Sequence, residues 1–353
     1  MSVMATHESY LVTGGSGLLG QHIVNQLLAR KPGANVAVFD LAKPPGFDKD
    51  VRVFTGDITD RHALETAVKE SKATCIFHTI AVLPGPPREV HLKINVGGTE
   101  NVISVALAQG VQKLVYTSSA SVVSDGHDQA GIDETVPYPS VPFDYYNETK
   151  AIAEQSVLSA NGRSGLATAS LRVAGLFGPG DRLTVPSFMN VLVTGRTGVQ
   201  IGNNTNLFDW TYIENAAYAH ILAADRLSPS HPKFSQVAGQ AFFISNDDPR
   251  PYWDFPRALW KAAGHTPESI TVLPQPVAMV IAVIMEFFCW LMGREAVLTR
   301  FRVTYVCMTR WCNISKAKEA LDYEPPVTLA EGIRRSVEFW QKYQAPPPFK
   351  KSQ

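Results

Sequence analysis

The sequence has few cysteines and no excess of charge of either sign. Its 353 residues include four cysteines, and 32 basic side chains balance 32 acidic ones. A net charge of zero argues against nucleic acid as the main partner. The cysteines form no Cys-x-x-Cys pair and stand at no zinc-binding spacing with histidine, so we expect buried, reduced thiols and no metal site. These cysteines are Cys75, Cys289, Cys307 and Cys312.

Targeting signals and repeats are also absent. The first residues show no charged region followed by an apolar run, so no cleavable signal is expected. No internal repeat is visible, and only residues 344–353, which are rich in proline, have the composition of a disordered tail. With 45% hydrophobic residues, the chain is long enough for a large core or for two unequal lobes.

A glycine-rich turn follows the first predicted strand, residues 9–13. Glycines stand at Gly14, Gly17 and Gly20, and an apolar helical pattern begins directly afterwards. Such a strand–turn–helix lets the backbone approach a pyrophosphate at the helix N-terminus, where free N–H groups favour anions. The pattern therefore predicts a dinucleotide site.

An acidic residue ends the second predicted strand, residues 35–39. Asp40 lies 20 residues after Gly20, where a carboxylate can accept hydrogen bonds from the adenosine ribose hydroxyls. No arginine follows it to receive a 2′-phosphate, so the sequence favours NAD over NADP.

The strand–helix rhythm of a parallel sheet continues through the first half of the chain. The predicted strand at residues 74–79 carries His78, which we interpret as a packed or turn residue, and a helix is expected from about residue 95 to residue 109. The strand at residues 113–119 ends in hydroxyl side chains, at the sheet edge where doubly wound folds bind ligands. The fold class is therefore α/β, a doubly wound Rossmann sheet.

Tyr146 and Lys150 are four residues apart, so on a helix they point the same way. A free tyrosine has a pKa of about 10, which is too high for a base at neutral pH. A nearby lysine cation favours the phenolate and lowers that pKa. The pair is one way to build a general base without histidine.

Together these motifs resemble the extended short-chain dehydrogenase/reductase superfamily, in its order and at its spacings. The resemblance implies that Tyr146 is the acid/base, that Lys150 holds the nicotinamide ribose and tunes the tyrosine, and that Ser119 orients the substrate oxygen. Asn95 matches a further asparagine of that superfamily. The implied cofactor-binding residues are Gly14, Gly17, Leu18, Gly20, Asp40, Asp57, Ile58, Tyr146 and Lys150.

An apolar segment at residues 277–292 interrupts the second half of the chain, with Glu286 as its only charged residue. As a helix, its 16 residues would extend about 24 Å, less than the roughly 30 Å of a bilayer core. Three interpretations remain open: a buried core helix, a helix that lies on or dips into a membrane, and a true span.

The later motifs narrow the resemblance. Residues 277–292, 298–303, 309–317 and 320–325 are similar to the 3β-hydroxysteroid dehydrogenase family. The likeness is greatest to its members that act on 4α-carboxysterols. It implies NAD-dependent oxidation of a 3β-hydroxyl with loss of CO₂ in sterol C4-demethylation. The implied location is the cytosolic face of the endoplasmic reticulum membrane, or a lipid droplet.

We therefore expect a Rossmann domain over residues 1–182 and a smaller substrate lobe over residues 183–343. That lobe would include returning Rossmann elements and the membrane-associating segment. Expected partners are a sterol or steroid, a membrane surface, a second copy of the chain and other sterol-demethylation enzymes, but not nucleic acid.

Alternatives are a 3β-hydroxysteroid dehydrogenase/isomerase and other extended short-chain dehydrogenases, including sugar-nucleotide epimerases. A nucleotide-sensing regulator on the same fold would not need the intact tyrosine and lysine. A carboxylated substrate would also need a cation or N–H donors, because a buried carboxylate is costly unless it is paired. The sequence cannot rank Arg172, Arg182, Arg300 and Arg302 as that partner.

Overall fold

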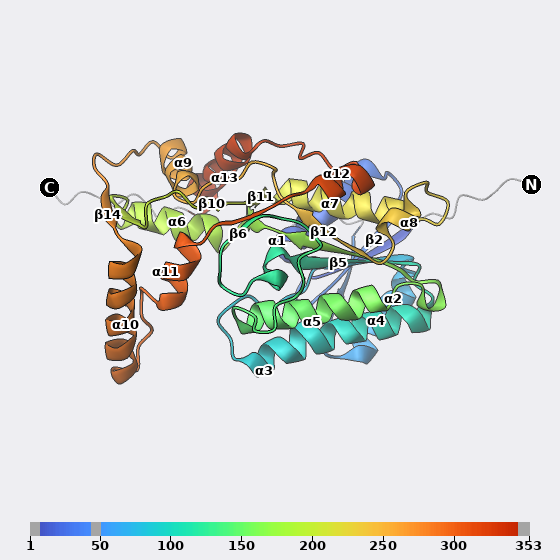
Figure 1. The fold of residues 1–353 in the computed structure, drawn as a ribbon. Helices are drawn as coiled ribbons and strands as arrows, with labels where there is room; N and C mark the ends of the chain where they lie inside the picture. Colours follow the sequence, from blue (N-terminus) through green and yellow to red (C-terminus); the bar gives the residue numbers. More distant parts are fainter. Residues whose placement is uncertain (1–7, 44–50, 345–353) are drawn as a thin grey trace, which may run out of the picture.

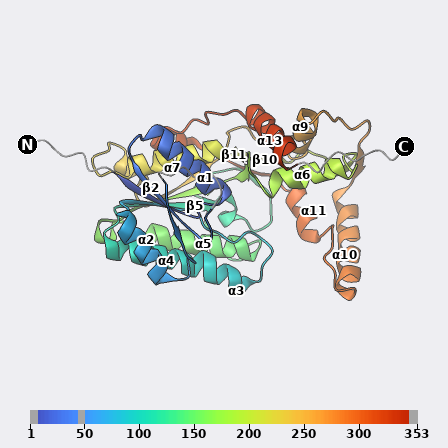
Figure 2. The same cartoon turned by 180° about the vertical axis from the view of Figure 1, so that it is seen from behind.

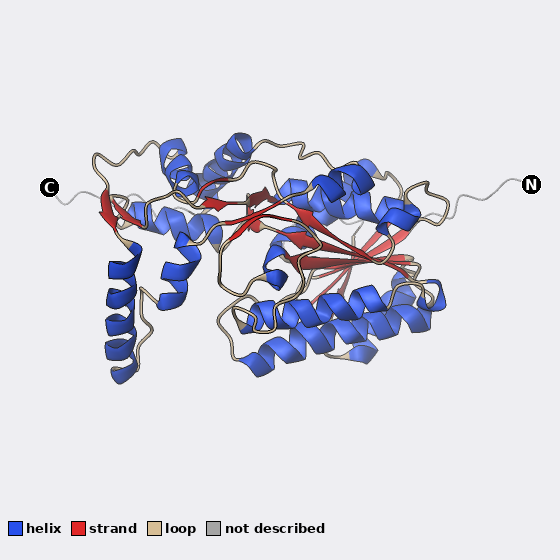
Figure 3. Cartoon of the chain, in the orientation of Figure 1, coloured by secondary structure: helices blue, strands red, loops and turns tan. Residues whose placement is uncertain are grey.

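The computed structural model describes residues 8–43 and 51–344. Its centre is a seven-stranded sheet in which every neighbouring pair is parallel. In spatial order the strands are β12 (Gln240–Ile244), β7 (Ala167–Val173), β5 (Lys113–Ser119), β4 (Cys75–His78), β1 (Ser9–Thr13), β2 (Asn35–Asp40) and β3 (Arg52–Thr55). The predicted doubly wound Rossmann sheet is confirmed, and Figure 3 shows it between layers of helix.

Helices cover both faces of this sheet, as the crossovers of parallel strands require. One layer contains α1 (Leu18–Arg30) and α7 (Ile213–Arg226), which pack on each other, with the short helices α8 (Phe234–Val237) and α12 (Ser315–Leu321) near β12. The other layer contains α2 (Arg61–Ser71), α4 (Gly98–Gln109) and α5 (Tyr145–Ser159) (Figures 1 and 2). Shorter helical turns are α3 (Arg88–His91), η1 (Leu92–Gly97), η2 (Ala120–Val123) and η3 (Arg163–Gly165).

The second lobe is built from small sheets and helices beside the carboxyl edge of the main sheet. A four-stranded sheet has the order β13 (Arg250–Pro251), β10 (Leu207–Phe208), β15 (Arg310–Cys312) and β6 (Gln129–Ile132). Two parallel pairs join β8 (Gly175–Phe177) to β11 (Trp210–Tyr212) and β9 (Val199–Ile201) to β14 (Thr271–Leu273). The helices are α6 (Thr184–Val193), α9 (Asp254–Ala262), α10 (Gln275–Leu291), α11 (Arg300–Cys307) and α13 (Leu329–Tyr343).

The lobes exchange elements, so residue 182 is not a clean boundary. β6 precedes that residue but pairs with β15 in the second lobe. In the opposite direction, β12 follows it and pairs with β7 in the main sheet, where we expected returning Rossmann elements. Chain order alone cannot show such exchange, because it depends on long-range pairing.

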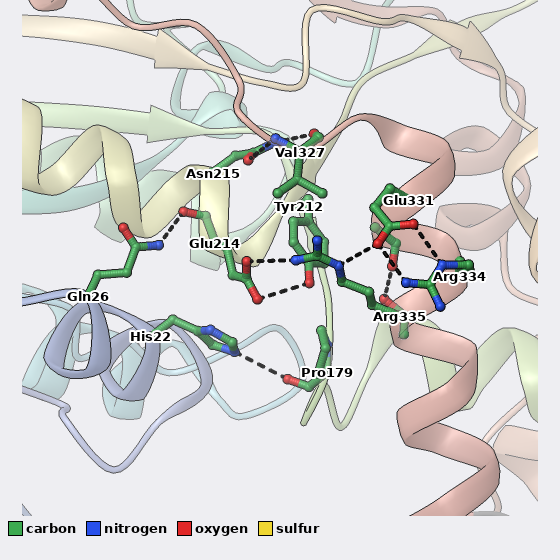
Figure 4. Close-up of polar contacts among 12 residues, drawn as sticks. His22, Gln26, Pro179, Tyr212, Glu214, Asn215, Val327, Glu331, Arg334 and Arg335 are labelled. Carbon is green, nitrogen blue, oxygen red and sulfur yellow. Dashed lines mark hydrogen bonds and ion pairs between the residues drawn. The ribbon is translucent and has the colours of Figure 1, made fainter. Parts of the chain in front are cut away.

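Polar contacts attach α13 and the segment before it to the end of β11 and the start of α7 (Figure 4). The Glu214 carboxylate accepts a hydrogen bond from the Tyr212 hydroxyl at 3.2 Å and pairs with Arg335 of α13 at 3.2 Å. Asn215 donates to the Val327 carbonyl at 2.7 Å and accepts from the Val327 N–H at 3.0 Å. Gln344 just beyond α13 is still described, whereas the rest of the predicted tail, residues 345–353, lies outside the described residues.

The apolar segment forms α10, which projects from the body of the molecule together with α11 (Figure 1). Only Ala278 and Ala282 of α10 are buried, so the core-helix interpretation is wrong. No helix in the described part of the chain is long and apolar enough to cross a membrane. Glu286, the charged exception, pairs with Arg300 of α11 at 2.7 Å and joins the two helices.

The burial of the cysteines follows these elements. Cys75 in the main sheet and Cys312 in β15 are buried, as expected, whereas Cys289 and Cys307 are partly exposed. The last two lie on α10 and at the end of α11, where the projecting helices leave more surface open. All four thiols are free.

Candidate active site

The turn between β1 and α1 forms a tight backbone cradle. Gly14 has a φ of 78°, in the left-handed region, and a Cβ there would lie 2.7 Å from the Thr79 hydroxyl oxygen. A Cβ on Gly20 would lie 2.2 Å from the Gly14 carbonyl oxygen, which already accepts the Gly17 N–H at 2.9 Å. No side chain caps the N-terminus of α1. The cradle therefore fits a pyrophosphate.

Asp40 faces this cradle from the end of β2. Its two carboxylate oxygens accept the Ser16 N–H at 2.9 Å and the Leu41 N–H at 2.7 Å. Asp57 is exposed just beyond β3, but the Ile58 side chain is buried and its carbonyl accepts from Asn101 at 3.0 Å. The glycines and Asp40 fit a dinucleotide, whereas the side chain of Ile58 packs in the core.

The start of α5 places two adjacent tyrosines, Tyr145 and Tyr146, in different environments. Asp144 caps the helix by accepting the Asn147 N–H at 2.7 Å, and the first turn then places Tyr145 in solvent, 55% exposed. Tyr146 is half-buried, and Lys150 one turn later is only 2% exposed. Tyr146, and not Tyr145, therefore shares an interior helix face with the lysine, as the spacing predicted.

Lys150 is held against β5. Its Nζ donates to the Thr117 carbonyl at 2.5 Å and lies 4.1 Å from the ring centroid of Tyr116. Burial lowers the pKa of Lys150 to about 7, while Glu154 one turn further along opposes that change. Burial therefore makes this ammonium easier to deprotonate than that of an exposed lysine.

The surroundings of Tyr146 affect its pKa in opposite directions. Burial raises the pKa of Tyr146 to about 12, while the Ser119 hydroxyl and the Arg310 guanidinium act to lower it. The Lys150 ammonium donates to the Thr117 carbonyl, and the lowering of the Tyr146 pKa by its positive charge stays a prediction. Ser119 itself is near the tyrosine, as predicted, and its Oγ lies 2.7 Å from the Oγ of Ser121.

Two buried histidines near Lys150 are neutral. His220 Nδ1 lies 2.7 Å from the Ala216 carbonyl and must donate to it, so its Nε2 accepts from the Thr117 hydroxyl at 2.8 Å. Burial lowers the pKa of His220 to about 4 and that of His78 to about 3. His78 is completely buried, so our interpretation of it as a packed residue holds.

A π-helical turn, η1, precedes α4 and includes Asn95. The helix expected over residues 95–109 is therefore α-helical only from Gly98 to Gln109, and Asn95 lies in the π turn before it. The Asn95 side chain accepts the Val82 N–H at 2.8 Å and donates to the Thr149 hydroxyl at 3.1 Å. It connects the loop after β4 to α5.

Comparison with known proteins identifies the family. A model of the 3-beta hydroxysteroid dehydrogenase/isomerase family matches residues 11–275. The chain belongs to this family. It is 45% identical to the sterol-4-alpha-carboxylate 3-dehydrogenase, decarboxylating, of Schizosaccharomyces pombe, over 92% of this chain and 95% of that protein. The protein of the same name from Saccharomyces cerevisiae is 43% identical, over 95% and 98% of the two chains.

A solved structure supports the fold of this family member. The enzyme WbmH of Bordetella bronchiseptica, in complex with NAD⁺, superposes with a TM-score of 0.74 over 96% of this chain and 100% of its own. The two sequences are 18% identical, so this likeness shows the fold alone.

Sequence reasoning missed a buried ion pair beneath the catalytic helix of this 3β-hydroxysteroid dehydrogenase family member. Glu154 is fully buried and pairs with Arg172 of β7 at 2.8 Å. Its carboxylate also accepts from the Ser170 hydroxyl at 2.7 Å and the Tyr138 hydroxyl at 2.6 Å. The available signal was the four-residue spacing from Lys150, which places Glu154 on the same helix face.

A second missed feature is an aromatic row between the projecting helices and α5. The ring centroids of Phe143 and Phe301 lie 4.8 Å apart, and those of Phe301 and Tyr305 lie 6.1 Å apart. Arg310 in β15 lies beyond them, 4.7 Å from the Tyr305 ring centroid. The alternation of aromatic and polar residues in this segment gave no sign of which side chains face Tyr146.

Proposed function

We propose that the protein is an NAD-dependent dehydrogenase that oxidises the 3β-hydroxyl of a 4α-carboxysterol to the 3-ketone, with loss of CO₂. The observation that carries the proposal is the arrangement of Ser119, Tyr146 and Lys150 at the carboxyl edge of the sheet. Support for the substrate comes from the relatives, which are named for this activity and align with nearly the whole chain.

The chain supplies binding, orientation and proton transfer, while NAD would supply the acceptor for the hydride from C3. Tyr146, as the phenolate, takes the proton from the 3-hydroxyl, and Ser119 donates a hydrogen bond that holds that oxygen in place. Lys150 binds the nicotinamide ribose. The 3-ketone then makes the neighbouring acid a β-keto acid, in which the electrons of the breaking C–C bond move to the ketone as CO₂ leaves.

The preference for NAD over NADP rests on Asp40. Its carboxylate accepts a hydrogen bond from the Ser16 N–H of the cradle. This places the carboxylate next to the position that the adenosine ribose hydroxyls would take. A 2′-phosphate at this position would meet a like charge. Asp57 adds a second acid nearby at the same sheet edge, with a pKa lowered by its hydrogen bonds from Thr59.

The proposal can be tested with purified protein, NAD and two substrates. One is a 4α-carboxysterol, and the other is the same 3β-hydroxysterol without the acid. NADH and CO₂ should appear in equal amounts from the first, and the second should react far more slowly. If both sterols are oxidised equally well, or if NADH forms while the acid is retained, the protein is instead a general 3β-hydroxysteroid dehydrogenase. A dehydrogenase/isomerase would be recognised by the additional shift of a ring double bond in its product.

We further propose that α10 associates with a membrane surface. Its outward side chains are large and apolar, with Trp290 73% exposed and both Phe287 and Phe288 55% exposed. Arg294, just after α10, and Arg302, on α11, are exposed, and such cations favour anionic headgroups. The aromatic row from Phe301 to Phe143 adds apolar side chains between α11 and the start of α5.

The proposed location is the cytosolic face of the endoplasmic reticulum membrane, with the lipid droplet as the alternative. A lipid substrate and four free thiols support a membrane that faces a reducing compartment. A homodimer and association with other sterol-demethylation enzymes remain predictions.

Vesicle flotation tests the membrane contact. The triple variant Phe287→Ser, Phe288→Ser and Trp290→Ser should stay in the soluble fraction with phosphatidylcholine–phosphatidylserine vesicles, while the unmodified protein floats. The matched control Leu41→Ser and Val141→Ser removes apolar side chains that are exposed elsewhere, 69% and 74%, and should float normally. Equal flotation of the triple variant would show that α10 is not the contact.

A further inference from the structure

The substrate of the proposed reaction carries a carboxylate next to the reacting carbon, and that charge needs a partner inside the site. The arginines that the sequence offered are engaged elsewhere or face solvent. Arg172 pairs with buried Glu154, and Arg300 pairs with Glu286 on the projecting helices. Arg182 is exposed, and Arg302 is exposed and donates to a backbone carbonyl of its own segment.

Arg310 has a different environment. It is half-buried in β15, and its guanidinium lies 4.9 Å from the Phe208 ring centroid and 4.7 Å from that of Tyr305. Its Nη2 donates to the Tyr305 hydroxyl at 3.1 Å. Within residues 8–43 and 51–344, no carboxylate forms an ion pair with it. Two aromatic rings therefore hold a cation that forms no ion pair with a described carboxylate, although its charge acts to lower the pKa of Asp144.

The hydrogen bond between these two residues leaves donors available for a ligand. Tyr305 accepts from Arg310, so the proton of its own hydroxyl can be donated to a third group. The guanidinium has five N–H donors in a planar fork, a geometry that matches a carboxylate. Arg310 and Tyr305 can therefore donate a charged and a neutral hydrogen bond to the same carboxylate.

This pair of donors borders the space around Tyr146. The rings of Tyr305, Phe301 and Phe143 follow one another from Arg310 to the start of α5, three residues before Tyr146. Arg310 also acts to lower the pKa of Tyr146. Asp144 also borders this space, but its carboxylate accepts the Asn147 N–H at 2.7 Å as the cap of α5. In the substrate, the 3-hydroxyl and the 4α-carboxylate are on adjacent carbons. A sterol with its hydroxyl at Tyr146 would thus present its acid within this neighbourhood.

We propose that Arg310 and Tyr305 bind the 4α-carboxylate of the substrate and give the enzyme its preference for acid-bearing sterols. The proposal rests on the proposed function and adds a specificity site to it. The flat sterol rings would lie along the aromatic row, with the acid at the Arg310 end.

The test compares kcat/KM for a 4α-carboxysterol with kcat/KM for the same 3β-hydroxysterol without the acid. Arg310→Met keeps the length of the side chain and removes its charge. Because Arg310 also favours the Tyr146 phenolate, some activity is lost with both substrates, and the ratio of the two values is the readout. We expect this ratio to fall by about 30-fold or more, as for a lost charge-assisted pair. Arg310→Lys should retain part of the preference.

Two further variants complete the experiment. Arg182→Met removes an exposed arginine and should leave the ratio unchanged. Tyr305→Phe removes a single hydroxyl and should lower the ratio by roughly 5-fold, the effect of losing about one neutral hydrogen bond. This variant provides the test if Arg310→Met fails to fold. An unchanged ratio in a folded Arg310→Met, or in Tyr305→Phe where the methionine variant is unfolded, overturns the proposal. A failure of the proposed function is distinct, because the unmodified enzyme would then show no preference for the acid.

Discussion

The buried pair of Glu154 and Arg172 should be the most sensitive point beneath the catalytic helix. We consider Glu154→Gln, which keeps the shape of the side chain and removes its charge. The variant leaves the Arg172 guanidinium, 4% exposed, without its counter-ion. Tyr138 and Ser170 also lose a charged acceptor. An uncompensated buried charge is strongly destabilising.

The magnitude follows from this burial. Breaking a buried pair by removing one partner costs about 3–5 kcal/mol, and glutamine retains some hydrogen bonds, so we expect about 3 kcal/mol. For 353 residues, an unfolding entropy of roughly 2.1 cal/mol/K per residue converts this to a Tm lower by about 4 °C. Adding Arg172→Met removes the stranded cation and should restore most of that loss.

Thermal unfolding measured by calorimetry checks the effect, with Glu338→Gln as a matched control on the surface of α13. Glu338 is 60% exposed and forms a surface pair with Arg334, so its loss should change Tm by less than about 1 °C. A Tm for Glu154→Gln within 1 °C of the unmodified protein would refute the reasoning. So would a double variant that is less stable than the single one.

The same substitution has a consequence for pH dependence. Burial acts to raise the pKa of Glu154, but Arg172 and the surrounding hydrogen bonds outweigh it, so the pKa lies below the ordinary carboxyl value. A depressed carboxyl pKa means that the stabilisation is present at neutral pH and is lost as the pH falls below the ordinary carboxyl range. Glu154 also acts to raise the pKa of Lys150. In Glu154→Gln, Lys150 should lose its proton at lower pH, and the alkaline limit of activity should move down.

Three further outcomes are expected. Tyr146→Phe should keep NAD binding, measured by fluorescence titration, while turnover falls by at least ~100-fold, as for a lost general base; near-normal turnover would remove Tyr146 from the mechanism. Asp40→Ser should narrow the ratio of kcat/KM for NAD over NADP, and equal use of both by the unmodified protein would contradict the role given to the acid. Gly20→Ala should abolish NAD binding in the same titration, because the new Cβ would lie 2.2 Å from the Gly14 carbonyl oxygen; normal affinity would show that the cradle can relax.

The cofactor-binding turn and the Tyr146–Lys150 pair could be predicted from the sequence because each depends on local geometry. Gly14 and Gly20 belong to a single turn that only glycine can form, and Asp40 stands at the end of a single strand. Tyr146 and Lys150 are placed by a single turn of one helix. In each case the residues that must cooperate lie within one or two neighbouring elements, so spacing along the chain carries the information.

The remaining features depend on contacts between distant segments. Arg310 reaches the neighbourhood of Tyr146 only because β15 lies between β10 and β6, and no local pattern specifies that order. The same holds for the pair of Glu154 and Arg172, which joins a helix to a strand, and for the exposure of α10, whose composition also suits a core helix. Hydrophobicity alone shows that a side chain is more stable away from water. Whether that side chain packs in the protein core or stays exposed on the surface depends on the tertiary fold.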